Sequence, residues 1–180
     1  MRDNIILIGM PASGKSTLGV VAAKYLGLDF VDCDIVIQRE RGETLASLIE
    51  RLGVDGFLDV ECDVLSRLSP PHPSVIATGG SAVLREAAMK HLRSLGTVVY
   101  LRVSLEAIER RISEPHARGV AMRNGETLAD VYAGRTPLYE KYADVILDEG
   151  NDTQQALAAR LAEMFRRARD EDGSQTPTER

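Results

Sequence analysis

The chain has 180 residues, of which 44% are apolar and 4% aromatic, with no tryptophan, so we expect one domain with a largely aliphatic core. Its formal net charge of −5 excludes a general nucleic-acid binder, because such proteins show a basic balance or a basic stripe. The first apolar run, 5–8, is too short for a signal peptide or a membrane span. We therefore expect a cytoplasmic protein without a membrane partner.

The first half of the chain opens with a short β-branched run that ends in glycine, which is typical of a buried strand. In chain order it reads as strand 4–9, helix 15–26, strand 30–32, helices 34–41, 45–52 and 56–68, and strand 74–77. Gly27 ends the first helix as a C′ glycine, and the proline cluster 70–73 follows the last one.

The second half continues the alternation of helices and strands. It reads as helix 83–94, strand 97–103, helix 105–112, a loop over 113–125, helix 127–139, strand 144–147, helix 153–169 and a polar, disordered tail over 170–180. Alternating strands and helices predict an α/β fold, with a parallel five-stranded sheet that carries helices on both faces.

Cysteine and histidine give no sign of a zinc site or a disulfide framework. The chain has two cysteines, Cys33 and Cys62, and its three histidines lack metal-binding spacing. We expect both thiols to be reduced and buried or half-buried.

Residues 9–16, GMPASGKS, match the phosphate-binding pattern G-x-x-x-x-G-K-[ST] and lie between a predicted strand and a predicted helix. Glycines let the backbone N–H groups of this loop face an anion, and the helix N-terminus adds partial positive charge. Lys15 is expected to reach the β- and γ-phosphates of ATP, and the Ser16 hydroxyl is expected to bind Mg²⁺. The predicted nucleotide-binding residues in and beside the loop are Gly9, Ala12, Ser13, Gly14, Lys15, Ser16 and Thr17.

Two carboxylates, Asp32 and Asp34, follow the second predicted strand, where the strand ends of such sheets meet the ligand crevice. One could hold metal-bound water while the other accepts a hydroxyl proton. The alternative is that Asp34 caps the next helix.

Six ordered segments resemble the shikimate kinases, small P-loop enzymes, over residues 4–165. They are GMPASGKST, FVDCD, GFLDVE, ATGGSAVL, ERRISEPHARG and RTPLYEKYAD. The resemblance implies a P-loop fold of the nucleoside-monophosphate-kinase type, a three-layer sandwich. It also implies one domain over 1–169, a substrate subdomain over 33–68 and a lid over 113–125.

The resemblance also implies roles for single residues. Asp34 would contact the acceptor hydroxyls and act as base, and Asp32 would help to place Mg²⁺. Arg118 would cover the transferring phosphoryl group, and Arg111 would pack on the adenine. The substrate-binding positions would be Asp34, Leu58, Glu61, Gly79, Gly80 and Arg135, with Arg135 pairing with the substrate carboxylate.

The chain departs from the family pattern on the substrate side. Leu58 stands where the family has an arginine, Ser81 replaces a glycine, and Gly119 follows Arg118 in place of proline. Losing the arginine removes a charge and a planar set of donors. Another arginine, such as Arg51 or Arg123, could replace it.

We therefore expect a monomeric, ATP-dependent kinase that phosphorylates a hydroxyl of a small carboxylate-bearing metabolite, with shikimate as the first candidate and 3-phosphoshikimate, an intermediate of aromatic amino acid biosynthesis, as the product. A second possibility is the same chemistry on homoserine, a sugar acid or another small hydroxy-acid. A third is a nucleotide-binding module without catalysis. The retention of Lys15, Ser16, Asp32, Asp34 and Arg118 argues against this third possibility, because a sensor needs neither a base nor a lid arginine.

Overall fold

The computed structural model describes residues 4–112 and 119–173, with side chains up to residue 167. Its sheet has five strands in the order β2-β3-β1-β4-β5, and every neighbouring pair is parallel, as predicted. The strands are β1 (Asn4–Ile8), β2 (Asp29–Asp32), β3 (Ser74–Ala77), β4 (Gly96–Arg102) and β5 (Val145–Asp148). Because β3 is buried throughout and β1 is buried from Ile5 to Ile8, helices must cover both faces of the sheet.

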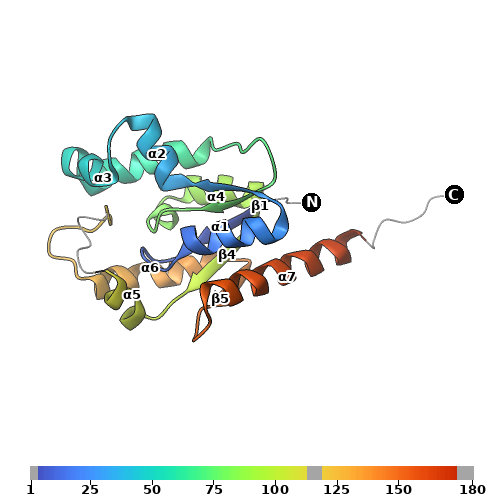
Figure 1. Ribbon diagram of the computed structural model, residues 1–180. Helices are drawn as coiled ribbons and strands as arrows, with labels where there is room; N and C mark the ends of the chain where they lie inside the picture. Colours follow the sequence, from blue (N-terminus) through green and yellow to red (C-terminus); the bar gives the residue numbers. More distant parts are fainter. Residues whose placement is uncertain (1–3, 113–118, 174–180) are drawn as a thin grey trace.

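Helices form a layer on each side of this sheet (Figure 1). On one face α1 (Lys15–Leu26) packs against α7 (Gln154–Gly173). On the other face lie α4 (Glu86–Leu95) and α6 (Leu128–Tyr142), with α5 (Leu105–Arg111) against α6. The result is the predicted three-layer arrangement.

The segment between β2 and β3 folds as α2 (Cys33–Arg41) and α3 (Leu45–Ser66). The prediction of two separate helices over 45–68 is partly correct, because Gly53 breaks α3 with non-helical angles of φ 70° and ψ 174°. This segment has a small apolar core of its own, separate from the main one. It contains Ile37, Leu45, Leu48, Phe57, Leu58, Val64 and Ala121. The region predicted as a substrate subdomain therefore supplies most of a second apolar cluster, while its Cys33 and Leu65 pack in the main core.

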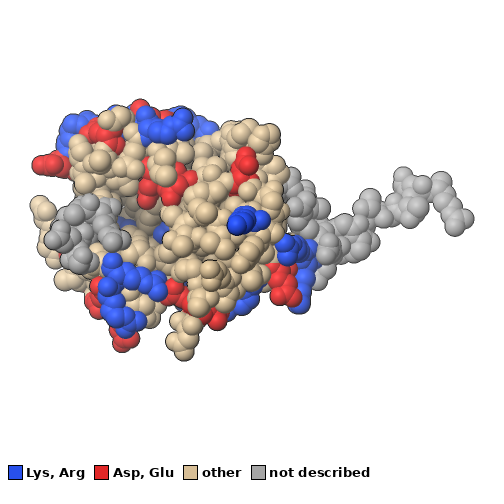
Figure 2. Space-filling model, viewed as in Figure 1, with Lys and Arg blue, Asp and Glu red and all other residues tan. Residues whose placement is uncertain are grey.

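The other differences from prediction lie at helix ends. A short 3₁₀ helix, η1 (Ala82–Leu84), precedes α4, and α7 continues to Gly173, beyond the predicted end at residue 169. Cys33 is buried and Cys62 half-buried, and both are free thiols as expected. None of the described helices is long and apolar enough to cross a membrane. On the face in Figure 2, acidic and basic side chains are interspersed.

Candidate active site

The predicted phosphate loop connects β1 to α1. Ala12 adopts a left-handed φ of 57°, and Gly14, the N-cap of α1, has φ 95°. The Lys15 ammonium is buried under the loop and donates to Gly9 O at 3.0 Å and Met10 O at 2.8 Å. The loop therefore encloses a cation at the place where the motif predicts phosphate binding.

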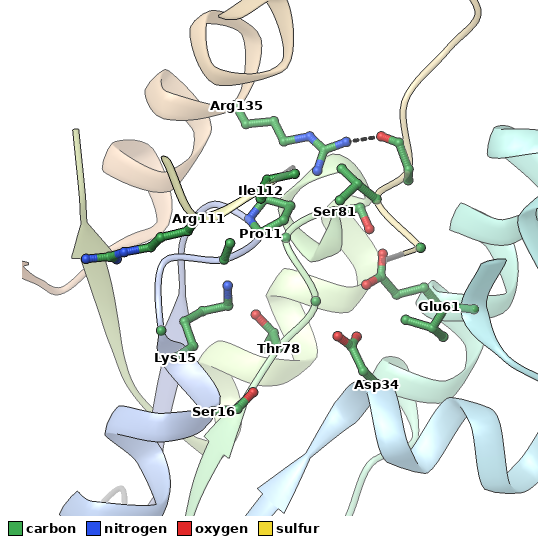
Figure 3. A pocket seen from close by; sticks show the side chains of 18 of the residues that line it. Pro11, Lys15, Ser16, Asp34, Glu61, Thr78, Ser81, Arg111, Ile112 and Arg135 are labelled. Carbon is green, nitrogen blue, oxygen red and sulfur yellow. Dashed lines mark hydrogen bonds between the residues drawn. The ribbon is translucent and has the colours of Figure 1, made fainter. Parts of the chain in front are cut away.

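A cavity of about 690 Å³ opens above this loop and gathers most of the predicted site residues (Figure 3). Those that line it are Ala12, Gly14, Lys15, Ser16, Thr17, Asp34, Glu61, Gly79, Gly80, Arg111 and Arg135. Gly9, Ser13 and Asp32 are not in its wall, and Arg118 lies outside the described residues. A volume of this size is typical of sites for small ligands.

The Asp32 and Asp34 carboxylates have different surroundings. Asp32 is the N-cap of α2, and its Oδ1 accepts from the backbone N–H of Asp34 at 3.0 Å. Its Oδ2 accepts from Ser16 Oγ at 2.7 Å. The alternative that Asp34 caps the helix is therefore wrong, and the Asp34 carboxylate faces the cavity instead (Figure 3).

Asp34 and Glu61 meet at Gly79. A Cβ at Gly79 would overlap Glu61 Oε1 and lie 2.9 Å from Asp34 Oδ1, so a side chain at this position would displace both acids. Asp34 Oδ1 and Glu61 Oε1 are buried and have no hydrogen-bond partner among the described residues. Buried polar atoms normally have partners, so this end of the cavity is suited to receive a ligand that donates hydrogen bonds.

Arg135 reaches the same end of the cavity from α6 and is only 5% exposed. Its Nη2 donates to the carbonyl oxygen of Ala121, whereas its Nη1 is buried without a partner among the described residues. Figure 3 shows the guanidinium and the Asp34 carboxylate on opposite sides of this end of the cavity. An acceptor with hydroxyls and a carboxylate has matching groups here for all three side chains.

Burial shifts the pKa values of three ionisable groups that line the cavity. Desolvation, reinforced by the charge of Asp32, raises the pKa of Asp34 to about 6. Desolvation raises the pKa of Glu61 to about 7, although a hydrogen bond from Ser81 acts in the opposite direction. Desolvation lowers the pKa of Lys15 to about 8, although the negative charges of Asp34 and Asp32 act to raise it. Perturbed groups gathered in a cavity are typical of an active site.

Comparison with known proteins assigns the chain to a family. The sequence model described as shikimate kinase matches residues 11–166. The chain belongs to the shikimate kinase family. It is 34% identical to a shikimate kinase of Thermodesulfovibrio yellowstonii, over 91% of this chain and 95% of that one. It is 38% identical to a shikimate kinase of Paracidovorax citrulli, over 88% of this chain and 90% of that one.

A solved structure agrees with the family assignment. The fold matches that of shikimate kinase from Acinetobacter baumannii in complex with shikimate with a TM-score of 0.83. The two sequences are 30% identical, and the match covers 92% of this chain and 93% of the other. The predicted fold and family are therefore confirmed.

Leu58, where the shikimate kinase pattern has an arginine, is not in the wall of the main cavity. It is 2% exposed and lines a second cavity of about 240 Å³. Arg85, Arg123 and Arg135 also line this second cavity, so Arg135 lies between the two. The prediction that Leu58 is part of the substrate site thus receives no direct support from the geometry. Arg123 lines the same second cavity as Leu58 and pairs there with Asp55 at 2.8 Å. Arg51 lines neither cavity.

Beside the predicted Arg111, at the end of the main cavity away from the acids, lie two residues that sequence reasoning missed, Glu149 and Gln154. Arg111 donates through Nη2 to both carboxylate oxygens of Glu149, at 2.9 and 2.8 Å. Gln154 lies beside it and also lines the cavity. No motif marks Glu149 or Gln154, but both follow β5, and the carboxyl end of that strand borders the crevice.

The residues present fit Mg²⁺ as bound with a nucleotide. Mg²⁺ usually takes one or two protein oxygens, with phosphates and waters as the other ligands. The Ser16 hydroxyl and the Asp32 carboxylate supply two oxygens 2.7 Å apart next to the loop. Among the described residues, no cluster of three or more His, Cys, Asp or Glu could hold a metal without a nucleotide.

Proposed function

We propose that this chain transfers the γ-phosphate of ATP to a hydroxyl of shikimate, giving 3-phosphoshikimate and ADP. The observation that carries this proposal is the single cavity with two different ends. A phosphate loop forms one end, and Asp34, Glu61 and Arg135 leave polar atoms unpaired at the other. Membership of the shikimate kinase family supports the same reaction.

The phosphate end would hold the triphosphate. Lys15 would leave the carbonyl oxygens of Gly9 and Met10 and pair with the β- and γ-phosphates. Ser16 and Asp32 would hold Mg²⁺, which neutralises phosphate charge when bound. Arg118 remains a proposal from the resemblance, as the arginine that covers the transferring group. The 113–125 lid is also a proposal, and residues 113–118 are not described.

The acceptor end would orient the hydroxyl and receive its proton. With a pKa of about 6, Asp34 is mostly ionised at neutral pH and can accept that proton. Glu61 would accept a hydrogen bond from a second hydroxyl, and the absence of a side chain at Gly79 leaves room for the carboxylates of Glu61 and Asp34. Arg135 Nη1 would donate to the acceptor carboxylate.

A second acceptor is considered because Leu58 stands where the family pattern has an arginine. Within the described part of the main cavity wall, Arg135 is the one guanidinium at the acceptor end, and Leu58 lines the second cavity instead. Another small hydroxy-acid, such as homoserine or a sugar acid, would fit a pocket with one carboxylate-binding arginine. We retain this as the alternative.

The experiment that tests the proposal is a coupled ADP-release assay over a panel of hydroxy-acids that includes shikimate, homoserine and gluconate. We expect shikimate to give the highest kcat/KM, with one phosphate per acceptor detected by mass spectrometry. A reaction without an acceptor measures ATP hydrolysis. ADP formation that does not depend on shikimate, with good turnover of another acid, would exclude shikimate and leave the kinase chemistry standing. Size-exclusion chromatography of the same preparation tests whether the protein is a monomer, as expected. We also expect the reaction to take place in the cytoplasm.

A further inference from the structure

Gln154 is a polar side chain at the nucleotide end of the cavity that the proposed reaction does not use. It is the first residue of α7 and lines the cavity beside Arg111 and Gly14. A Cβ at Gly14 would lie 2.9 Å from Gln154 Nε2, so the carboxamide packs directly against the phosphate loop. Figure 3 shows Arg111 on the opposite side of Lys15 from Asp34 and Glu61, which places this corner away from the acceptor.

The orientation of the Gln154 carboxamide is set by Glu149. Gln154 Nε2 donates to Glu149 Oε1 at 3.3 Å, and Arg111 pairs with both oxygens of the same carboxylate. Glu149 is only 6% exposed, so this arrangement is held inside the protein. A carboxylate can only accept hydrogen bonds, and the NH₂ group is the only donor of a carboxamide. The amide nitrogen of Gln154 must therefore face Glu149.

In this orientation the carboxamide oxygen, Gln154 Oε1, is not engaged by Glu149. The oxygen is buried and has no hydrogen-bond partner among the described residues. A ligand in this corner therefore meets an acceptor that needs a donor.

We propose that Gln154 selects the base of the nucleotide by accepting a hydrogen bond from the 6-amino group of adenine, with Glu149 as the positioning residue. This inference rests on the proposed function in one respect, namely that a nucleoside triphosphate occupies the cavity. A 6-oxo purine would place its own acceptor against Gln154 Oε1. Turning the amide to suit that base would break the bond to Glu149 and set two acceptors against each other.

The test is equilibrium binding, measured by displacement of a fluorescent ATP analogue, for ATP, ITP, CTP and purine riboside triphosphate. Purine riboside triphosphate has only hydrogen at position 6, and ITP has oxygen there. We expect the wild type to bind ATP about 3- to 10-fold more tightly than purine riboside triphosphate, and about 10- to 100-fold more tightly than ITP. CTP, with an amino group on a smaller ring, is expected to bind more weakly than ATP.

Two variants separate base selection from structural support. In Gln154→Leu, ATP affinity should fall to that of purine riboside triphosphate, while the affinity for the latter stays unchanged. In Glu149→Gln, the new amide can donate to Gln154 Oε1 and let Gln154 turn its Nε2 toward the base, so the ratio of ATP to ITP affinity should approach one. Gln155→Leu is the matched control, because Gln155 is exposed and lines none of the described cavities.

Several results would overturn the inference. They are equal binding of ATP and ITP by the wild type, CTP binding as tight as that of ATP, and an equal loss for all the triphosphates in Gln154→Leu. Binding requires no acceptor, so the expected pattern can hold even if shikimate is not phosphorylated. Failure to bind any triphosphate would overturn this inference and the proposed function together.

Discussion

The two ends of the cavity are built in different ways. The phosphate end is one continuous stretch, 9–17, in which backbone conformation does most of the work. The acceptor end is assembled from side chains on α2, α3 and α6 and from the glycine turn after β3. The first end recognises a group that many substrates share, whereas the second must recognise one particular acceptor.

The two ends also differ in how their polar atoms are satisfied. In the phosphate loop, the Lys15 ammonium has partners, because it donates to carbonyl oxygens of its own loop. At the acceptor end, Asp34 Oδ1, Glu61 Oε1 and Arg135 Nη1 lack partners among the described residues. Unpaired buried groups destabilise a fold, so specificity at this end is obtained at the expense of stability.

The largest effect is expected at the phosphate end. Lys15→Ala should lower kcat by at least about 10³-fold and weaken ATP binding, because the ammonium faces the charge that builds up during transfer. Steady-state kinetics and nucleotide titration measure both effects. Lys24→Ala, an exposed lysine on the same helix, is the control and should behave as wild type. Near-normal turnover of Lys15→Ala would remove the phosphate-loop assignment.

At the acceptor end, Asp34→Asn should lower kcat about 10²–10⁴-fold and leave the Kd for ATP nearly unchanged. The amide has nearly the same shape but cannot accept the hydroxyl proton. Comparing kcat with the ATP Kd separates the two ends of the cavity. Wild-type kcat in this variant would mean that Asp34 is not the base.

A smaller effect is expected at Leu58. Leu58→Arg should raise kcat/KM for shikimate by about tenfold, because a second guanidinium would join Arg135 near the carboxylate. Leu58→Met, which conserves volume, is the control and should leave the kinetics unchanged. If the wild type already uses shikimate well and the arginine variant does not improve on it, another residue supplies the charge. Arg123 is then the residue to mutate, since it lines the same second cavity.

The Asp34 carboxylate at the acceptor end also makes the stability of the fold depend on pH. Folding raises the pKa of Asp34 to about 6 from an ordinary value of 3.8, so between these values the folded protein binds more protons than the unfolded chain. The group therefore favours folding below pH 4, and this contribution is lost as pH rises through 6.

Asp34→Asn should accordingly raise the free energy of unfolding by about 1–3 kcal/mol at pH 7.5, with the gain shrinking toward zero at pH 4. Urea denaturation at the two pH values measures it. Asp29→Asn removes an exposed carboxylate and should give no such gain. A variant that is less stable than wild type at pH 7.5 would show that the Asp34 charge is well compensated.

The same contrast explains what could be predicted from the sequence. The order of strands and helices follows from short-range patterns, and the structure agrees with it. The phosphate loop also follows from a short-range pattern, and it connects β1 to α1 as expected, whereas its binding role stays a prediction. The meeting of Asp34 and Glu61 at Gly79 depends on how α2 and α3 pack, which no local pattern encodes. Gln154 was missed because its role depends on Glu149 and Arg111, which only the fold brings together. Leu58 was assigned to the site by alignment with the family pattern, whereas its side chain lines the second cavity.

Recognition of the acceptor carboxylate by Arg135 can be measured with a cycle of one variant and one substrate analogue. The measurement is kcat/KM for shikimate and for its methyl ester, with wild type and with Arg135→Ala. We predict that the wild type prefers shikimate by about 10²-fold, and that the variant loses this preference while binding ATP normally. If Arg135→Ala weakened both substrates equally and kept the preference for the acid, the carboxylate would be recognised elsewhere and this assignment of the acceptor end would be contradicted.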